Sequence, residues 1–175
     1  DRWEGTSYAG HPRVHRAEGG AERCHSVLNG LDALAALASS DDWVLVHDAA
    51  RPCLRPADLE RMLETLADDP IGGILAVPVR DTMKRADGSG RIGATVDREA
   101  LWHALTPQMF RLGVLREALS AVVSAGDLVT DEAEAVERIG RAPRLVEGHA
   151  DNLKVTRPED LSLARFFLQS QGRSC

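Results

Sequence analysis

The chain has 175 residues, of which 43% are hydrophobic, so it is long enough for one domain with a buried core. Its formal net charge of −6 argues against a general binder of nucleic acids or membrane surfaces. No apolar run approaches the roughly 20 residues that a membrane-spanning helix needs, and residues 1–16 do not resemble a signal peptide. Three widely spaced cysteines without a CxxC pair favour a reducing, cytoplasmic location.

The first half of the chain alternates helical and strand patterns after a loop over residues 1–17. Apolar residues recur at helical spacing over residues 22–38 and 57–68, which we predict as helices. Continuous apolar runs over residues 43–47 and 72–79 are typical of buried parallel strands. The first of these runs ends in Asp48.

The segment around residues 80–98 has a different character. Two short polar runs, residues 82–85 and 93–96, flank a turn-rich stretch at residues 87–90, which predicts a β-hairpin. A hairpin this polar cannot bury a face of its own. We therefore expect it to project as an arm and to pack on something else, although basic residues on a solvated arm would give the same pattern.

The remaining segments complete an alternating pattern. Helices are predicted over residues 112–125 and 131–139, and short strands over residues 144–146 and 153–155. Thr156 and Glu159 have the spacing of a capping box, which predicts that they open a last helix. Strands alternating with helices indicate an α/β fold with a mostly parallel sheet, helices on both faces and a protruding hairpin arm.

Ligands in such sheets bind at the carboxyl ends of strands, which makes Asp48 a candidate site residue. A carboxylate there, with Arg51 three positions on, can hold Mg²⁺ beside an anionic substrate. Asp151 and Lys154 could add a second metal-facing carboxylate and an ammonium for phosphate. From spacing alone two other readings stay open: Asp48 caps a turn, and Asp151 and Lys154 are surface charges.

Six runs of residues, in order along the chain, together resemble the 2-C-methyl-D-erythritol 4-phosphate cytidylyltransferase family. They are GGAERCHSVLNGL from Gly19, VLVHDAARPC from Val44, AVPVRDTMKR from Ala76, VDREALWHALTPQMF from Val96, TDEAEAVE from Thr130 and EGHADNLKVTRPEDLSLA from Glu147. They cover nearly all of residues 19–164. No single run is decisive, but six in register are highly specific.

The resemblance implies a Rossmann-like nucleotidyltransferase fold in one domain over residues 1–175. It implies a cytidylyltransferase that joins CTP and 2-C-methyl-D-erythritol 4-phosphate, giving 4-diphosphocytidyl-2-C-methyl-D-erythritol and pyrophosphate in isoprenoid biosynthesis. Mg²⁺ or another hard divalent cation is the implied cofactor. The implied partner is a second copy of the chain, joined through the arm at residues 80–98, with neither nucleic acid nor membrane involved.

The resemblance also implies roles for particular residues. Asp48 and Asp151 match metal ligands, and Lys154 matches a lysine that contacts the nucleotide phosphates. The other matched positions are Gly20 and Ser26 at the cytosine pocket, Arg51, Thr130 and Thr156 around the sugar alcohol and its metal, and Thr82 and Arg98 on the arm that binds substrate phosphate in the partner subunit. Catalytic roles are expected for Lys154, Asp48 and Arg51.

Two departures from the family pattern affect these expectations. The family opens with a strand and a Gly-rich loop that contacts the triphosphate, and nothing like that loop occurs in this sequence. We therefore expect the domain to be incomplete at its N-terminus and this polypeptide alone to be inactive or nearly so. Ala21 also stands where relatives can carry Asp.

Two other functions remain open from the sequence. A ribitol-5-phosphate cytidylyltransferase would share the fold and chemistry and differ in its alcohol pocket. A non-catalytic dimerising module is the alternative that the missing loop favours.

Overall fold

A computed structural model describes residues 3–173, so Cys175 lies outside the described part of the chain. The elements, in chain order, are α1 (Arg23–Ala35), β1 (Trp43–Val46), α2 (Pro56–Leu66), β2 (Gly72–Pro78), β3 (Met83–Ala86), β4 (Ile92–Val96), β5 (Trp102–Arg111), α3 (Leu112–Ser124), α4 (Glu132–Arg138), β6 (Arg144–Glu147) and α5 (Asp160–Ser170). The α/β class is confirmed, and the helices expected from apolar spacing begin and end within a few residues of the predicted bounds.

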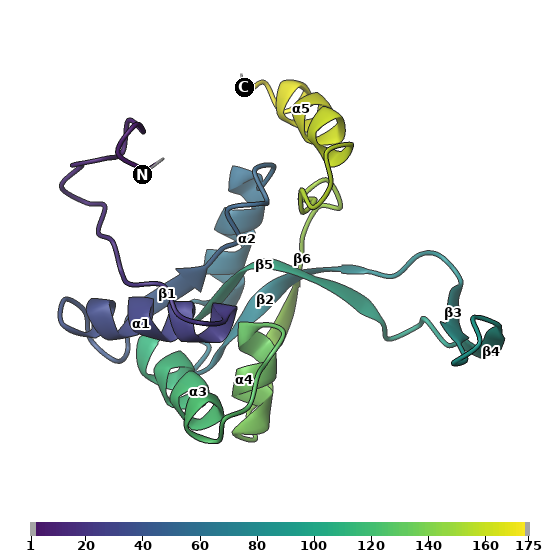
Figure 1. Ribbon diagram of the computed structural model, residues 1–175, viewed down its shortest axis with the longest axis horizontal. Coiled ribbons are helices and arrows are strands. Elements are labelled where there is room, and N and C mark those ends of the chain that lie inside the picture. The colour runs from purple at the N-terminus through teal and green to yellow at the C-terminus, as the bar shows by residue number, and fades with distance from the viewer. Residues whose placement is uncertain (1–2, 174–175) are drawn as a thin grey trace.

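The central sheet is mixed, which corrects the expectation of a mostly parallel one. Its strand order is β1-β5-β2-β6. β5 pairs antiparallel with both β1 and β2, whereas β2 and β6 pair in parallel. β1, β2 and β6 therefore run in one direction, and the reversed strand β5 lies between β1 and β2 (Figure 1).

β5 itself was not expected from the sequence. Pro107 lies inside it, and a proline normally argues against a central strand because it cannot donate a ladder hydrogen bond. The pairing with β2 shifts register between Ile74 and Ala76, opposite the stretch that contains Pro107. A local irregularity of this kind accommodates a proline inside a sheet.

Helices cover both faces of the sheet, as expected. On one face α1, α3 and α4 pack around Phe110, Leu115 and Leu119, each fully buried (Figure 1). On the other face α2 places Met62 and Leu66 against the sheet. Each fully buried side chain of this size stabilises the fold by about 1.5–3 kcal/mol, so the two layers hold the sheet between them.

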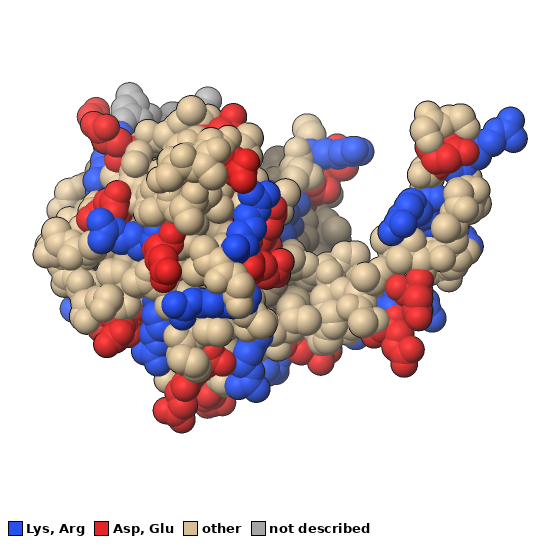
Figure 2. Space-filling model, turned by 90° about the horizontal axis from the view of Figure 1, so that it is seen from below, with Lys and Arg blue, Asp and Glu red and all other residues tan. Residues whose placement is uncertain are grey.

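The predicted hairpin forms and projects from the body as an arm, defined here as residues 80–98. β3 pairs antiparallel with β4, and Lys84 Nζ donates to Thr95 Oγ1 at 2.6 Å. Every side chain of β3 is exposed, and Ile92 of β4 is 70% exposed. Figure 2 shows the arm standing away from the body with basic side chains along it. A two-stranded hairpin without further packing is only marginally stable in water.

Two local predictions near the C-terminus were wrong. Residues 153–155 are not a strand, because Val155 makes a single backbone bond, to Ala50 O at 2.8 Å, instead of a ladder. The capping box between Thr156 and Glu159 does not form either. Instead, the Asp160 carboxylate accepts from the Thr156 N–H at 2.8 Å and from its hydroxyl at 3.1 Å.

None of the helices within residues 3–173 combines the length and apolar character needed to cross a bilayer.

Candidate functional site

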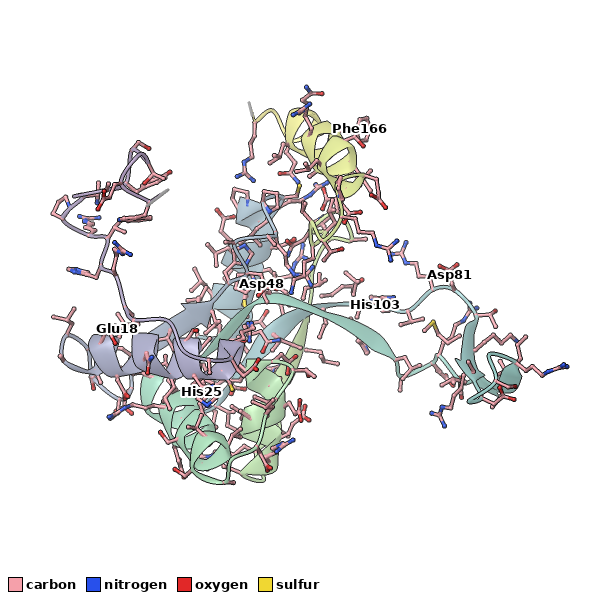
Figure 3. All side chains as sticks on the ribbon, in the orientation of Figure 1. Glu18, His25, Asp48, Asp81, His103 and Phe166 are labelled. Carbon is pink, nitrogen blue, oxygen red and sulfur yellow. The ribbon has the colours of Figure 1, made fainter. Side chains whose placement is uncertain are left out.

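The candidate site is built around Asp48, two residues beyond the end of β1. The Asp48 N–H donates to Thr106 Oγ1 of β5 at 3.1 Å, and the same hydroxyl lies 2.9 Å from His47 Nδ1. The neighbouring strand thus fixes the backbone from which the carboxylate projects. Figure 3 labels Asp48 near the middle of the molecule. The side chain is 14% exposed, so the carboxylate is sheltered but reachable.

Three cationic side chains converge on this carboxylate, one from the same loop and two from distant segments. Lys154 Nζ lies 3.1 Å from Asp48 Oδ2, and Arg51 Nε lies 3.6 Å from the same oxygen. Arg23 Nη2 approaches Asp48 Oδ1 at 3.4 Å. The acid at the end of the first strand and the ammonium of Lys154 therefore face one another, and an isolated surface position for Lys154 is excluded.

These contacts keep Asp48 ionised. Burial by itself would raise the pKa of Asp48, but the hydrogen bond from Lys154 and the positive charges of Lys154, Arg23 and Arg51 outweigh it and lower that pKa. Burial also lowers the pKa of Arg51, although Asp48 opposes the shift. The site holds a fixed negative charge inside a ring of positive ones.

Glu132 and Arg23 also belong to the site, although neither was predicted as a site residue. Glu132 is 1% exposed, and its two oxygens accept from Arg23 Nη1 at 2.5 Å and Nη2 at 2.9 Å. Burial tends to lower the pKa of Arg23, but Glu132 and Asp48 raise it overall. Glu132 looked like an ordinary acid in the first turn of a helix, and the run from Gly19 that contains Arg23 was the only signal for its partner.

Arg51 and Asn152 link the two sides of the site. Arg51 Nη1 donates to the Asn152 carbonyl at 2.8 Å, and Asn152 Nδ2 donates to the Thr106 carbonyl at 2.8 Å. Two buried atoms of this pair, Arg51 Nε and Asn152 Oδ1, have no hydrogen-bond partner among the described residues. Buried polar atoms without partners are costly, so their place beside the Asp48 cluster is consistent with a ligand site.

Asp151, the second predicted metal ligand, is engaged elsewhere. Its carboxylate accepts from Arg55 Nε at 2.9 Å and Nη2 at 2.6 Å, and from Gln171 Nε2 at 3.1 Å. Burial would raise the pKa of Asp151, but the bonds from Arg55 and Gln171 lower it. The described contacts join Asp151 to α2 and to the end of α5, and they do not join it to Asp48.

The other predicted body residues lie near the segments that build the cluster. The Gly20 N–H donates to Ser26 Oγ at 2.8 Å, and a Cβ on Gly20 would lie 2.2 Å from that of His25, so only glycine fits. Thr130 precedes the helix that carries Glu132, and its hydroxyl donates to Glu134 at 2.9 Å. Thr156 lies two residues beyond Lys154 and is held by Asp160.

The two predicted arm residues lie apart from this cluster. Thr82 lies just before β3, and Arg98 follows β4 and donates to the Arg80 carbonyl. Both side chains are exposed. Figure 3 places Asp81 out on the arm, well away from Asp48. No contact within residues 3–173 brings Thr82 or Arg98 to the Asp48 cluster of the same chain.

The donor set suits a metal that is shared with a phosphorylated ligand. The described residues include no group of three His, Cys, Asp or Glu side chains that could hold a metal ion alone. Mg²⁺ commonly takes one or two carboxylates and completes its shell with phosphate oxygens and water. Asp48 can supply such a carboxylate, and the surrounding cations can neutralise a polyphosphate.

Comparison with known proteins decides the family. The sequence profile of 2-C-methyl-D-erythritol 4-phosphate cytidylyltransferase matches residues 1–170. The chain belongs to this family. It is 62% identical over 164 residues to the cytidylyltransferase of that name from Pseudomonas putida strain GB-1, covering 93% of this chain and 70% of the relative. The enzyme from Pseudomonas aeruginosa PAO1 is 61% identical over 160 residues, covering 91% of this chain and 68% of the relative.

Solved structures of the family share the fold. The cytidylyltransferase from Francisella tularensis superposes with a TM-score of 0.84 at 36% identity, covering 96% of this chain and 78% of that one. The Thermus thermophilus enzyme superposes with a TM-score of 0.76 at 35% identity, covering 90% and 78%. This chain therefore has the overall fold of cytidylyltransferases of known structure.

Proposed function

We propose that the protein transfers the cytidylyl group of CTP to 2-C-methyl-D-erythritol 4-phosphate, forming 4-diphosphocytidyl-2-C-methyl-D-erythritol and pyrophosphate. The observation that carries this function is the convergence of Lys154, Arg51 and Arg23 on Asp48 in a chain of the cytidylyltransferase family. The comparisons favour neither the ribitol-phosphate alternative nor the non-catalytic one.

The reaction needs positioning and charge neutralisation more than covalent chemistry. A phosphate oxygen of the alcohol substrate attacks the α-phosphorus of CTP, the new P–O bond forms, and the bond to the bridging oxygen breaks as pyrophosphate leaves with the electron pair. Lys154, Arg51 and Arg23 supply fixed positive charge for the phosphate oxygens in the transition state. Because these side chains already surround Asp48, little reorganisation is needed when the substrates bind.

The cofactor in this proposal is Mg²⁺ or another hard divalent cation held by Asp48. When bound together with the nucleotide, the ion neutralises charge on the phosphates. Asp151 stays a prediction as a second ligand, and its bidentate bonds to Arg55 support a structural role instead.

The proposed active form is a homodimer joined through the arm. Support comes from the exposure of β3 and of Ile92, and from the absence, within residues 3–173, of contacts that carry Thr82 or Arg98 to the site of the same chain. In a dimer the partner's arm would bring these two residues to the substrate phosphate. The roles of Gly20 and Ser26 at the base, and of Thr130 and Thr156 near the alcohol, remain predictions, as does the cytoplasmic location.

The test is turnover of CTP with Mg²⁺ and either alcohol phosphate, measured for the protein that carries this chain. We expect 2-C-methyl-D-erythritol 4-phosphate to be used and ribitol 5-phosphate to be poor. Asp48→Asn should lower kcat/KM by roughly 10²-fold or more, because a charge at the metal and phosphates is lost.

Asp32→Asn is the matched control. It removes the same charge from an exposed pair with Arg116 of α3, 2.6 Å away, and should leave turnover unchanged. Equal rates for Asp48→Asn and the native protein, or a preference for ribitol 5-phosphate, would overturn the proposal.

A further inference from the structure

The segment that delivers Lys154 has no regular secondary structure of its own. Residues 148–159 contain neither helix nor strand, yet Asn152 and Lys154 must reach Arg51 and Asp48 with defined geometry. A lysine side chain has several rotatable bonds, and ordering it costs conformational entropy. Its placement therefore depends on whatever holds the backbone of this segment.

Residues of α2 and its N-cap hold the end of β6 and the start of this segment through three successive contacts. Arg55 binds Asp151 with two hydrogen bonds of 2.6 and 2.9 Å. The side chain of Asp58 accepts from the His149 N–H at 3.1 Å and lies 2.6 Å from His149 Nδ1. The third contact comes from Arg61, whose Nη1 donates to the Glu147 carbonyl at 2.7 Å.

The spacing of these contacts is regular. Residues 55, 58 and 61 are three apart along α2 and its N-cap, which brings them to one side of the helix, whereas residues 151, 149 and 147 are two apart on the chain that leaves β6 and turns at residues 150–151. The helix and the segment therefore run side by side in opposite directions and are joined at each step. We call these six residues the α2 clasp.

Asp58 is the central member of the clasp and is completely buried. A buried carboxylate carries a large desolvation cost, and replacing a buried polar pair with apolar side chains is often neutral for stability. Asp58 is therefore poorly explained as a stabiliser of the core. Its two bonds to His149 instead fix where residues 149–155 leave the sheet.

The position set by the clasp is transmitted to Lys154 through the backbone. The Asn152 N–H donates to the His149 carbonyl at 3.2 Å, and the Val155 N–H donates to the Ala50 carbonyl at 2.8 Å. Lys154 lies between these two bonds. A shift of His149 would therefore move the Asn152 end of the short stretch that carries the ammonium and strain the Val155–Ala50 bond at its other end.

We propose that the α2 clasp positions Lys154 against Asp48, with Asp58 and Arg55 as positioning residues that touch neither substrate nor metal. The catalytic consequence rests on the proposed function, whereas the placement of Lys154 does not. A cavity of about 710 Å³ lies against the outer side of the clasp and is lined in part by Arg61, Gly148 and His149.

Hydrogen exchange of single backbone amides, measured by NMR on this chain, tests the placement. Asp58→Leu removes both acceptors for His149 and should raise the exchange rates of Asn152 and Val155 by about tenfold, while amides in α3 keep theirs. Asp58→Asn retains an amide oxygen as acceptor and should restore most of the protection. Asp32→Asn, at the exposed ion pair with Arg116, should change none of these rates.

A second variant keeps the test decisive if Asp58→Leu fails to fold. Arg55→Gln cuts the clasp at Asp151 from a partly exposed position, 38% of the side chain, and should raise the same two exchange rates. Unchanged protection of Asn152 and Val155 in every folded clasp variant would overturn the proposal.

Measurements of enzyme turnover distinguish a positioning role of Asp58 from a purely structural one. Asp58→Leu should lower kcat/KM roughly 10–100-fold in the native background, the range found when groups that orient a site residue are lost. In a Lys154→Gln background it should have little further effect, because both changes act on the same ammonium. Fully additive losses would contradict the clasp. If the native protein shows no turnover but the exchange rates change as expected, the proposed function fails and the clasp stands.

Discussion

Asp48 keeps three cationic side chains together before any ligand binds. Lys154, Arg51 and Arg23 all lie within 3.6 Å of its oxygens, and Glu132 adds a second anchor for Arg23. Without these carboxylates the like charges would repel one another. The ion pairs therefore serve both the binding of phosphate and the stability of the free protein.

This arrangement predicts how stability depends on pH. The pKa of Asp48 in the folded protein is lowered, so its ion pairs stabilise the fold above the unfolded pKa of about 4 and are lost as the pH falls through the folded value. Asp48→Asn should lower the free energy of unfolding at pH 7 by roughly 1–3 kcal/mol.

Urea unfolding at pH 7 and pH 3 checks this. The difference in unfolding free energy between Asp48→Asn and the native protein should be smaller at pH 3 than at pH 7. The exposed-pair control Asp32→Asn should differ much less from the native protein at pH 7. A difference in unfolding free energy that is larger at pH 3 would contradict the assignment of these ion pairs.

At the level of residues, the sequence could predict only part of the site. The strand-end rule and the family runs brought Asp48, Arg51 and Lys154 together correctly. Glu132 was missed because its partner Arg23 is 109 positions away, and no local pattern reports a contact that only tertiary packing creates. Asp151 was tied to a metal by its neighbours in sequence, although its nearest charged partner in space is Arg55.

The next prediction concerns the glycine that ends α3. Gly126 follows α3 with φ of +72°, a conformation that strains residues with a Cβ, and nothing lies within 4 Å of the site of an added Cβ. Gly126→Ala should therefore destabilise the protein by about 1 kcal/mol through backbone strain alone.

Gly30 offers the opposite case for comparison. It lies inside α1, where an added Cβ also meets nothing within 4 Å, so Gly30→Ala should stabilise by about 0.5–1 kcal/mol. Thermal unfolding of Gly126→Ala and Gly30→Ala measures both changes in stability. Shifts of the same sign in the two variants would mean that backbone conformation does not explain these glycines.

Elements were predictable where a repeating pattern determines them. Helices such as α2 and α3 follow from apolar spacing, and the end of α3 follows from Gly126. β5 could not be predicted in the same way, because Pro107 opposes strand formation locally and the pairing with two neighbours overrides it. The start of α5 was predicted three residues too early, since the capping box makes Thr156 the N-cap whereas Glu159 holds that position and Asp160 accepts from the Thr156 backbone.

For the whole molecule, the arm predicts self-association. Ile92 is 70% exposed on an arm that packs on nothing else among the described residues, so Ile92→Glu should weaken dimerisation by about tenfold or more without lowering the melting temperature of the body. Sedimentation velocity over a range of concentrations measures this. Leu128→Glu, 55% exposed in the loop after α3, is the control and should not alter assembly. A native protein that stays monomeric throughout would contradict the prediction.

The reversed strand β5 also determines how early during synthesis of the chain the Asp48 site can form. Within residues 3–173, β1 pairs only with β5, and the hydroxyl that holds the Asp48 backbone comes from β5 too. A ribosome adds about 5–20 residues per second, so roughly 3–13 s separate the synthesis of Asp48 from that of the last residue of β5. Throughout that interval a nascent chain carries an unpaired apolar strand, which is the kind of segment that chaperones bind.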